Sequence, residues 1–151
     1  MKNRNILIYS SFILYVIIMI WLLFIQRISY INYDNYWDKL IENINIIPFR
    51  TISEYLFTDR NADSEIIKHA FVNLAGNIVM FIPLGFFLAY TESSDKAFRA
   101  IIIKTILIIT AVEIIQLFSL TGSFDIDDLI LNTIGSLTGY IIHRIIFKNK
   151  H

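Results

Sequence analysis

Long uninterrupted runs of apolar residues alternate with polar connections along this chain. The first run, Ile6 to Ile25, contains no charged residue, and three more runs cover residues 70–90, 100–120 and 129–147. A helix of about 20 residues crosses the hydrocarbon core of a bilayer. The pattern predicts an all-α integral membrane protein, with four transmembrane helices forming one bundle and one domain over residues 1–151.

Two of the runs contain features that affect how their helices would behave. The first run follows Lys2 and Arg4 and lacks a small-residue cleavage site, so we expect it to remain as an anchor. The second contains Pro83, which a membrane helix tolerates when neighbouring groups satisfy the backbone. Close helix packing is predicted at four glycines, with ligand approach as the alternative for the first of them. These glycines are Gly76, Gly85, Gly135 and Gly139.

Composition supports the membrane assignment and excludes several function classes. The chain is 56% hydrophobic and 17% charged, and its 13 basic and 13 acidic side chains give no net charge. Without an excess of positive charge, we expect no nucleic-acid partner. The absence of cysteine excludes disulfides, thiolate metal sites and a thiol nucleophile.

Basic residues gather in the connections on one side of the four predicted helices. They are Lys2, Arg4, Lys96, Arg99, Arg144, Lys148 and Lys150. The connection "TGSFDIDD" on the opposite side contains three acids and no base. Because cytoplasmic loops of membrane proteins are enriched in lysine and arginine, we predict a multi-pass cell-membrane protein with both termini in the cytoplasm.

The long segment between the first two runs is predicted to lie on the outer membrane surface. Its aromatic residues are typical of an interfacial belt and comprise Tyr30, Tyr33, Tyr36 and Trp37. Apolar residues at helical spacing then predict an amphipathic interfacial helix that Pro48 ends. These residues are Leu40, Ile41, Ile44 and Ile47. The following stretch "TDRNADSEIIK" is predicted to be a polar loop.

Polar residues recur in the outer halves of the last three predicted helices. Asn73 and Asn77 share one helical face, as do Glu113 with Gln116 and Asp128 with Asn132, while Asp125 and Asp127 come just before the fourth helix. If the three helices are neighbours, these groups form one polar cluster. The predicted site residues are Asn73, Asn77, Glu113, Gln116, Asp125, Asp128 and Asn132.

Each of these residues also has a purely structural interpretation. An aspartate before a helix can cap its N-terminus, and amides inside spans often form hydrogen bonds between helices. Lys104 can extend its ammonium group to the headgroups. For Glu113 the functional interpretation is favoured, because placing a carboxylate within a membrane span costs roughly 3 kcal/mol and usually marks a binding site or a transport pathway.

Four stretches of the sequence resemble the VanZ-like membrane protein family. They are "NIIPFRTI" from Asn45, "NLAGNIVMFIPLGFFL" from Asn73, "EIIQLF" from Glu113 and "FDIDDLILNTIGSLTGY" from Phe124. The resemblance covers nearly the whole chain and implies a connection with low-level resistance to the lipoglycopeptide teicoplanin, without an established enzyme activity. The family commonly has an arginine shortly before the first aspartate of the last block, where this chain has Ser123. Arg50 or a metal ion would then have to take the role of that arginine.

The chemistry of the predicted cluster leaves several functions open. No serine–histidine pair, cysteine or phosphate-binding glycine loop supports nucleophilic catalysis or nucleotide hydrolysis. Glu113, Asp125 and Asp128 can supply oxygen ligands for Mg²⁺ or Ca²⁺. The same groups can instead hold a cationic or hydroxyl-rich headgroup directly. Without a cation, Glu113 would take up a proton.

Three interpretations follow from this chemistry. In the first, an outer-leaflet polar pocket binds an amphiphile, either a membrane lipid or lipid-linked cell-envelope intermediate, or a lipoglycopeptide antibiotic. In the second, the protein is an enzyme that acts on a lipid headgroup, with Glu113 as general base and the aspartates holding a metal. In the third, it is an accessory subunit whose polar groups only hold the helices together.

Overall fold

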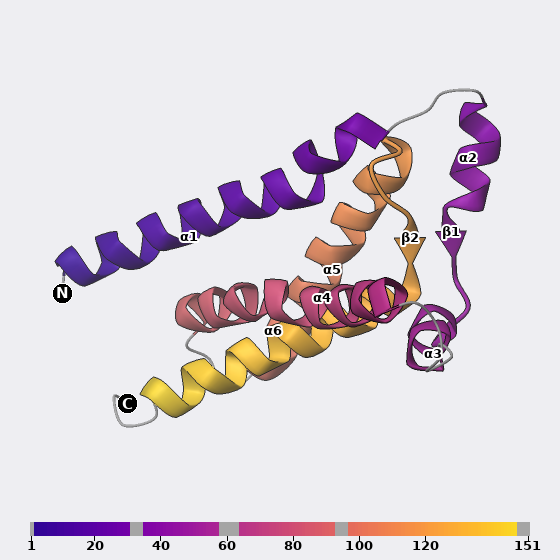
Figure 1. Cartoon of the computed structure of the whole chain (residues 1–151). Coiled ribbons are helices and arrows are strands. Elements are labelled where there is room, and N and C mark those ends of the chain that lie inside the picture. Colours follow the sequence, from indigo (N-terminus) through magenta and orange to yellow (C-terminus); the bar gives the residue numbers. More distant parts are fainter. Residues whose placement is uncertain (1, 31–34, 58–63, 93–96, 148–151) are drawn as a thin grey trace. The chain divides into compact units, whose positions relative to one another are not determined.

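The computed structural model describes residues 2–30, 35–57, 64–92 and 97–147 of the chain. Four of its helices are long and apolar enough to cross a membrane, as predicted (Figure 1). They are α1 (Lys2–Leu23), α4 (Ser64–Thr91), α5 (Ala97–Phe118) and α6 (Ile126–Phe147). The all-α membrane architecture is therefore confirmed. Tyr33, Lys96, Lys148 and Lys150, used in the sequence predictions, lie outside the described residues.

All four membrane helices begin earlier than the predicted apolar runs, and two of these starts have a local cause. α4 begins at Ser64, so the end of the expected polar loop is helical, with Glu65 in the first turn, where a negative charge complements the helix dipole. α6 begins at Ile126 because Asp125 caps it, and the carboxylate Oδ1 of Asp125 accepts the backbone N–H of Asp127 at 2.8 Å. As expected, α4 continues through Pro83.

The outer segment differs more from the prediction. The interfacial helix α2 (Tyr36–Glu42) ends well before Pro48. Residues Ile44–Asn45 instead form a short strand, β1, which pairs with β2 (Phe124–Asp125). The pairing gives the extended backbone hydrogen-bond partners, as the N–H of Phe124 donates to the carbonyl of Asn43 at 2.8 Å. A further short helix, α3 (Arg50–Leu56), follows.

The chain divides into two compact units. One comprises Met1–Ile44 and Glu113–Phe124, and the other comprises Asn45–Val112 and Asp125–His151. In the first unit, α1 continues into a 3-10 helix, η1 (Ile25–Tyr30). The side chain of Gln116 donates to the carbonyl of Leu23 at 3.0 Å, and the hydroxyl of Tyr36 donates to the carbonyl of Phe118 at 2.9 Å. These bonds connect the end of α5 to α1 and α2.

In the second unit, α4 and α6 run parallel with their backbones in contact (Figure 1). A Cβ atom added at Gly135 would lie 2.1 Å from the carbonyl oxygen of Ile78, and one at Gly139 would lie 1.9 Å from that of Ile82. Gly85 approaches the backbone of α6 equally closely. The predicted packing role is thus confirmed for these three glycines. It is wrong for Gly76, around which a Cβ would meet nothing within 4 Å.

The part of α5 that belongs to this unit contacts α6 through a pair of buried hydroxyl groups. The hydroxyls of Thr105 and Ser136 lie 2.7 Å apart and are almost completely buried. Lys104, one residue earlier, forms an ion pair with Glu92 at 2.6 Å. Its charge is therefore held beside the end of α4.

We expect Gly135→Ala to destabilise the protein and Gly76→Ala to be tolerated. The new methyl group at position 135 would overlap the backbone of α4, and overpacking of this kind costs about 1 to 3 kcal/mol. Thermal unfolding of the purified variants in detergent measures the difference. Equal midpoints for the two variants would show that α4 and α6 do not pack through Gly135.

Candidate functional site

Asp127 connects α6 to the loop that leads into α3. Its carboxylate accepts the backbone N–H of Phe49 through Oδ1 at 2.5 Å and that of Ile52 through Oδ2 at 3.1 Å. Phe49 is the N-cap residue of α3, and its own side chain forms no capping bond. Asp127, which is completely buried, therefore caps α3 from a different helix. The sequence offered this aspartate as a cap for the helix that follows it, whereas in the structure it caps α3.

This connection holds Phe49 in an unusual backbone conformation. Its φ of 64° and ψ of 9° lie in the left-handed helical region, which costs a residue with a side chain on the order of 1 kcal/mol. The backbone N–H of Phe49 points to the charged acceptor on α6. A hydrogen bond to a charged group contributes about 1.5 to 3 kcal/mol, enough to offset that cost.

Asp125 holds the same loop from the neighbouring strand. Its Oδ2 accepts the hydroxyl of Thr51 at 2.7 Å and the side-chain amide of Asn45 at 3.2 Å. The amide of Asn45 also donates to the hydroxyl of Thr51 at 2.9 Å. Both carboxylates of the "FDID" stretch are thus hydrogen-bonded to residues 45–52, and we call Asp125, Asp127 and these partners the aspartate–loop cluster.

Two predicted asparagines form hydrogen bonds near this cluster. Asn77 on α4 donates its side-chain amide to Oδ1 of Asp128 on α6. Asn73, one turn earlier on α4, donates to the hydroxyl of Tyr55 on α3 at 3.3 Å. The structure therefore brings Asn77 and Asp128 together, whereas Asn73 contacts α3.

Asn132 lies deeper in the same unit. It is one turn after Asp128 and three residues before Gly135, which places it on the face of α6 that packs against α4. The residue is 3% exposed, and its side-chain Oδ1 has no hydrogen-bond partner among the described residues. Buried acceptors are nearly always satisfied, so this oxygen requires an explanation.

Glu113 and Gln116 belong to the first unit, whereas Asn77 and Asn132 belong to the second. Both side chains are buried. Gln116 forms the hydrogen bond to α1 described above, which is the structural role that the sequence left open for it. The convergence of Glu113 with the two asparagines stays a prediction.

Arg50, which the family resemblance offered as one of two substitutes for an arginine near position 123, has its partner on its own helix. Its guanidinium forms an exposed ion pair with Glu54 at 3.1 Å, one turn further along α3. Backbone N–H groups, a hydroxyl and an amide surround Asp125 and Asp127 instead. Among the described residues, neutral donors therefore surround these carboxylates.

The donor set of the aspartate–loop cluster is a poor fit to a metal ion. All four carboxylate oxygens of Asp125 and Asp127 accept hydrogen bonds from protein donors. A cation would have to displace several of these bonds. No group of three or more histidine, aspartate or glutamate side chains suited to a metal occurs in the described parts of the chain.

Sequence reasoning missed several residues that organise this region. They are Asn45, Phe49, Thr51, Thr105 and Ser136. The available signal for the first three was the "NIIPFRTI" motif, in which the polar residues Asn45 and Thr51 flank an apolar stretch. Ser136 is eight residues after Asp128 on the same face of α6, so the polar face was longer than we inferred.

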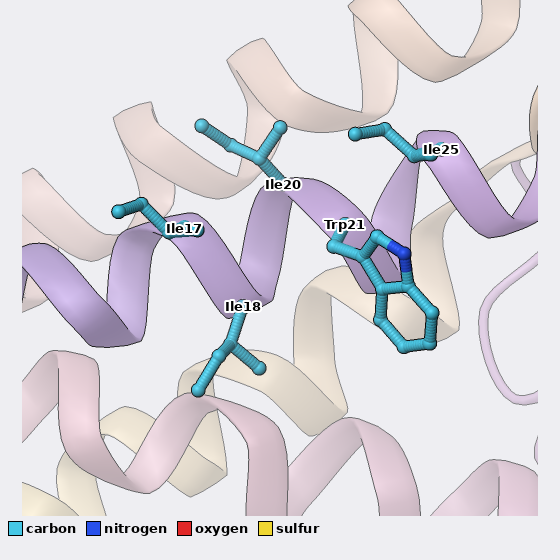
Figure 2. Close-up of a pocket in the computed structure, with 5 residues that line it drawn as sticks. All are labelled: Ile17, Ile18, Ile20, Trp21 and Ile25. Carbon is cyan, nitrogen blue, oxygen red and sulfur yellow. The ribbon is translucent and has the colours of Figure 1, made fainter.

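A hollow on α1 and η1 offers a contrast to this polar region. Figure 2 shows its lining residues, Ile17, Ile18, Ile20, Trp21 and Ile25. None of them is charged, and all are isoleucine or tryptophan. Such a surface suits lipid chains, and the indole N–H of Trp21 is its one side-chain donor.

We expect Asp127→Asn to weaken the aspartate–loop cluster. An amide offers only one acceptor oxygen and would turn an N–H donor toward one of the two backbone donors, at a cost of about 1 to 3 kcal/mol. The matched control is Asp38→Asn, which changes an exposed aspartate on α2. Trypsin should cleave after Arg50 faster in the first variant only. Equal cleavage rates would contradict the capping role of Asp127.

Comparison with known proteins agrees with this architecture. The model of the VanZ/LLP1 family matches residues 12–147 of the chain. Protein VanZ from Enterococcus faecium is 26% identical over 139 residues, which cover 91% of this chain and 73% of that protein. No solved structure gives a significant match. The family match covers the larger part of the first membrane span and the whole of the other three, and the chain belongs to the VanZ/LLP1 family.

Proposed function

We propose that this protein lowers susceptibility to teicoplanin-type lipoglycopeptides by binding an amphiphile at the polar face of α4 and α6. Asn77, Asp128 and Asn132 would form that binding site. Similarity to protein VanZ along most of the chain supports the link to resistance. The four apolar helices support an amphiphilic ligand, because such a ligand reaches a membrane protein through the bilayer.

The observation that carries this proposal is the buried Oδ1 of Asn132. An acceptor without a donor destabilises the folded state by about 1 to 3 kcal/mol, so selection for stability alone would favour an apolar residue there. A ligand that donates a hydrogen bond would recover this free energy on binding. Proteins retain destabilising groups of this kind mainly at functional sites.

The neighbouring groups indicate the chemistry of the ligand. Asp128, one turn before Asn132, carries a carboxylate, and the free acceptor of Asn132 is a carbonyl oxygen. Both favour a head group rich in hydrogen-bond donors, such as hydroxyls or an ammonium. A lipid-linked cell-envelope intermediate and the lipoglycopeptide itself both meet this description. A bare phosphate would be repelled by the carboxylate.

The proposal places the polar face toward the outer leaflet. The basic connections support cytoplasmic termini, which put the start of α6 and the aspartate–loop cluster on the outer side. A ligand in the cell envelope would then reach the site without crossing the membrane.

Expression in a susceptible bacterium should raise the inhibitory concentration of teicoplanin several-fold. It should leave that of a glycopeptide without an acyl chain unchanged. Asn132→Leu, which keeps the side-chain size and removes the acceptor, should abolish the effect. Thr138→Val is the matched control, because the hydroxyl of Thr138 bonds only to its own helix at Ile134.

All variants must be compared at equal amounts in the membrane. Full resistance in Asn132→Leu would reject the binding site, and no protection by the parent protein would reject the function.

Topology is tested with single cysteines in this cysteine-free chain. A membrane-impermeant thiol reagent should label Ser123→Cys in intact cells and leave Ser94→Cys unlabelled until the cells are opened. The reason is that Ser123 precedes α6 on the predicted outer side, whereas Ser94 lies between the spans of α4 and α5. The opposite pattern would place the polar face in the cytoplasm.

A further inference from the structure

The loop held by the aspartate–loop cluster presents an apolar tip. Residues 46–49 read Ile-Ile-Pro-Phe, and Ile46, Ile47 and Phe49 are 67%, 57% and 60% exposed. Phe57, just after α3, is 84% exposed. Large apolar side chains exposed together in this way usually mark an interaction surface.

The backbone N–H groups of residues 47–50 are bonded within the protein. The N–H of Ile47 donates to the side chain of Asn45 at 3.4 Å, and the N–H of Phe49 donates to Asp127. The backbone N–H of Arg50 donates to the backbone carbonyl of Ile47 at 3.3 Å. Pro48 has no N–H to satisfy. The N–H groups from residue 47 to residue 50 therefore need no water.

This combination fits a lipid environment better than a watery one. A backbone segment can enter a water-poor region only when its polar groups find partners inside the protein. The left-handed conformation of Phe49, fixed by the buried carboxylate of Asp127, keeps the tip in one shape. A flexible polar loop would require neither feature.

The tip is also tied to the ends of two membrane helices. Asp127 is the second residue of the span Ile126–Phe147, and Asn73, which bonds Tyr55 of α3, is the third residue of the span Phe71–Thr91. The loop and α3 thus lie at the level where both helices enter the bilayer. We infer that residues 46–49 insert into the interfacial region of the bilayer, with Phe49 and the isoleucines directed at the lipid chains.

Fluorescence quenching tests this inference independently of the proposed resistance function. Trp21→Phe and Trp37→Phe remove the native tryptophans, and Phe49→Trp places a single reporter at the tip. The full chain is reconstituted in phosphatidylcholine vesicles with or without bromine on the acyl chains. We expect brominated lipid to reduce the emission at least two-fold and aqueous acrylamide to have little effect.

The matched control is Glu54→Trp in the same background, because Glu54 is an exposed polar position on α3. Its emission should respond to acrylamide more than to brominated lipid. If Phe49→Trp does not fold, Ile46→Trp provides the same test without changing the residue that has the left-handed backbone conformation. Adding Asp127→Asn should lower the quenching of the tip by brominated lipid.

Quenching of the tip by acrylamide alone would place it in water. Protection from both quenchers would show that protein covers it, either another part of the chain or a second copy. Each of these two results would overturn the inference.

Discussion

Polar groups at the membrane level must find partners within the protein, because lipid chains provide neither donors nor acceptors. This constraint accounts for several side-chain hydrogen bonds between the helices and loops of the larger unit. The hydroxyls of Thr105 and Ser136 bond to each other, and the amide of Asn77 bonds to Asp128. The buried carboxylate of Asp127 receives two backbone donors from a loop. The carbonyl oxygen of Asn132 departs from the rule among the described residues, and for that reason it directs attention to a ligand.

The aspartate–loop cluster answers why an apolar chain places acids at the start of a membrane helix. One carboxylate begins α6, through the bond from Asp125 to the N–H of Asp127. The next carboxylate begins α3, which is separated from it by more than 70 residues along the chain. The free energy of these charged hydrogen bonds offsets the conformational cost at Phe49. Two helix ends and an exposed apolar loop are thereby fixed by two side chains.

Among the described residues, neutral donors rather than a cationic side chain bind Asp125. These donors are the hydroxyl of Thr51, the side-chain amide of Asn45 and the backbone N–H of Asp127. Arg50 pairs with Glu54 on the exposed side of α3.

The sequence by itself determined the four membrane helices, because a bilayer selects apolar segments of a set length whatever their tertiary contacts. It also determined that Gly135 and Gly139 face a neighbouring helix, since four-residue spacing places both on one side of α6. The partners of the polar residues were decided by tertiary structure alone. Asp127 bonds a loop far away in the chain, and Gly76 faces open space although it resembles the other glycines in sequence. Helical spacing fixes which face a residue occupies, whereas the identity of the group opposite depends on how separate segments pack.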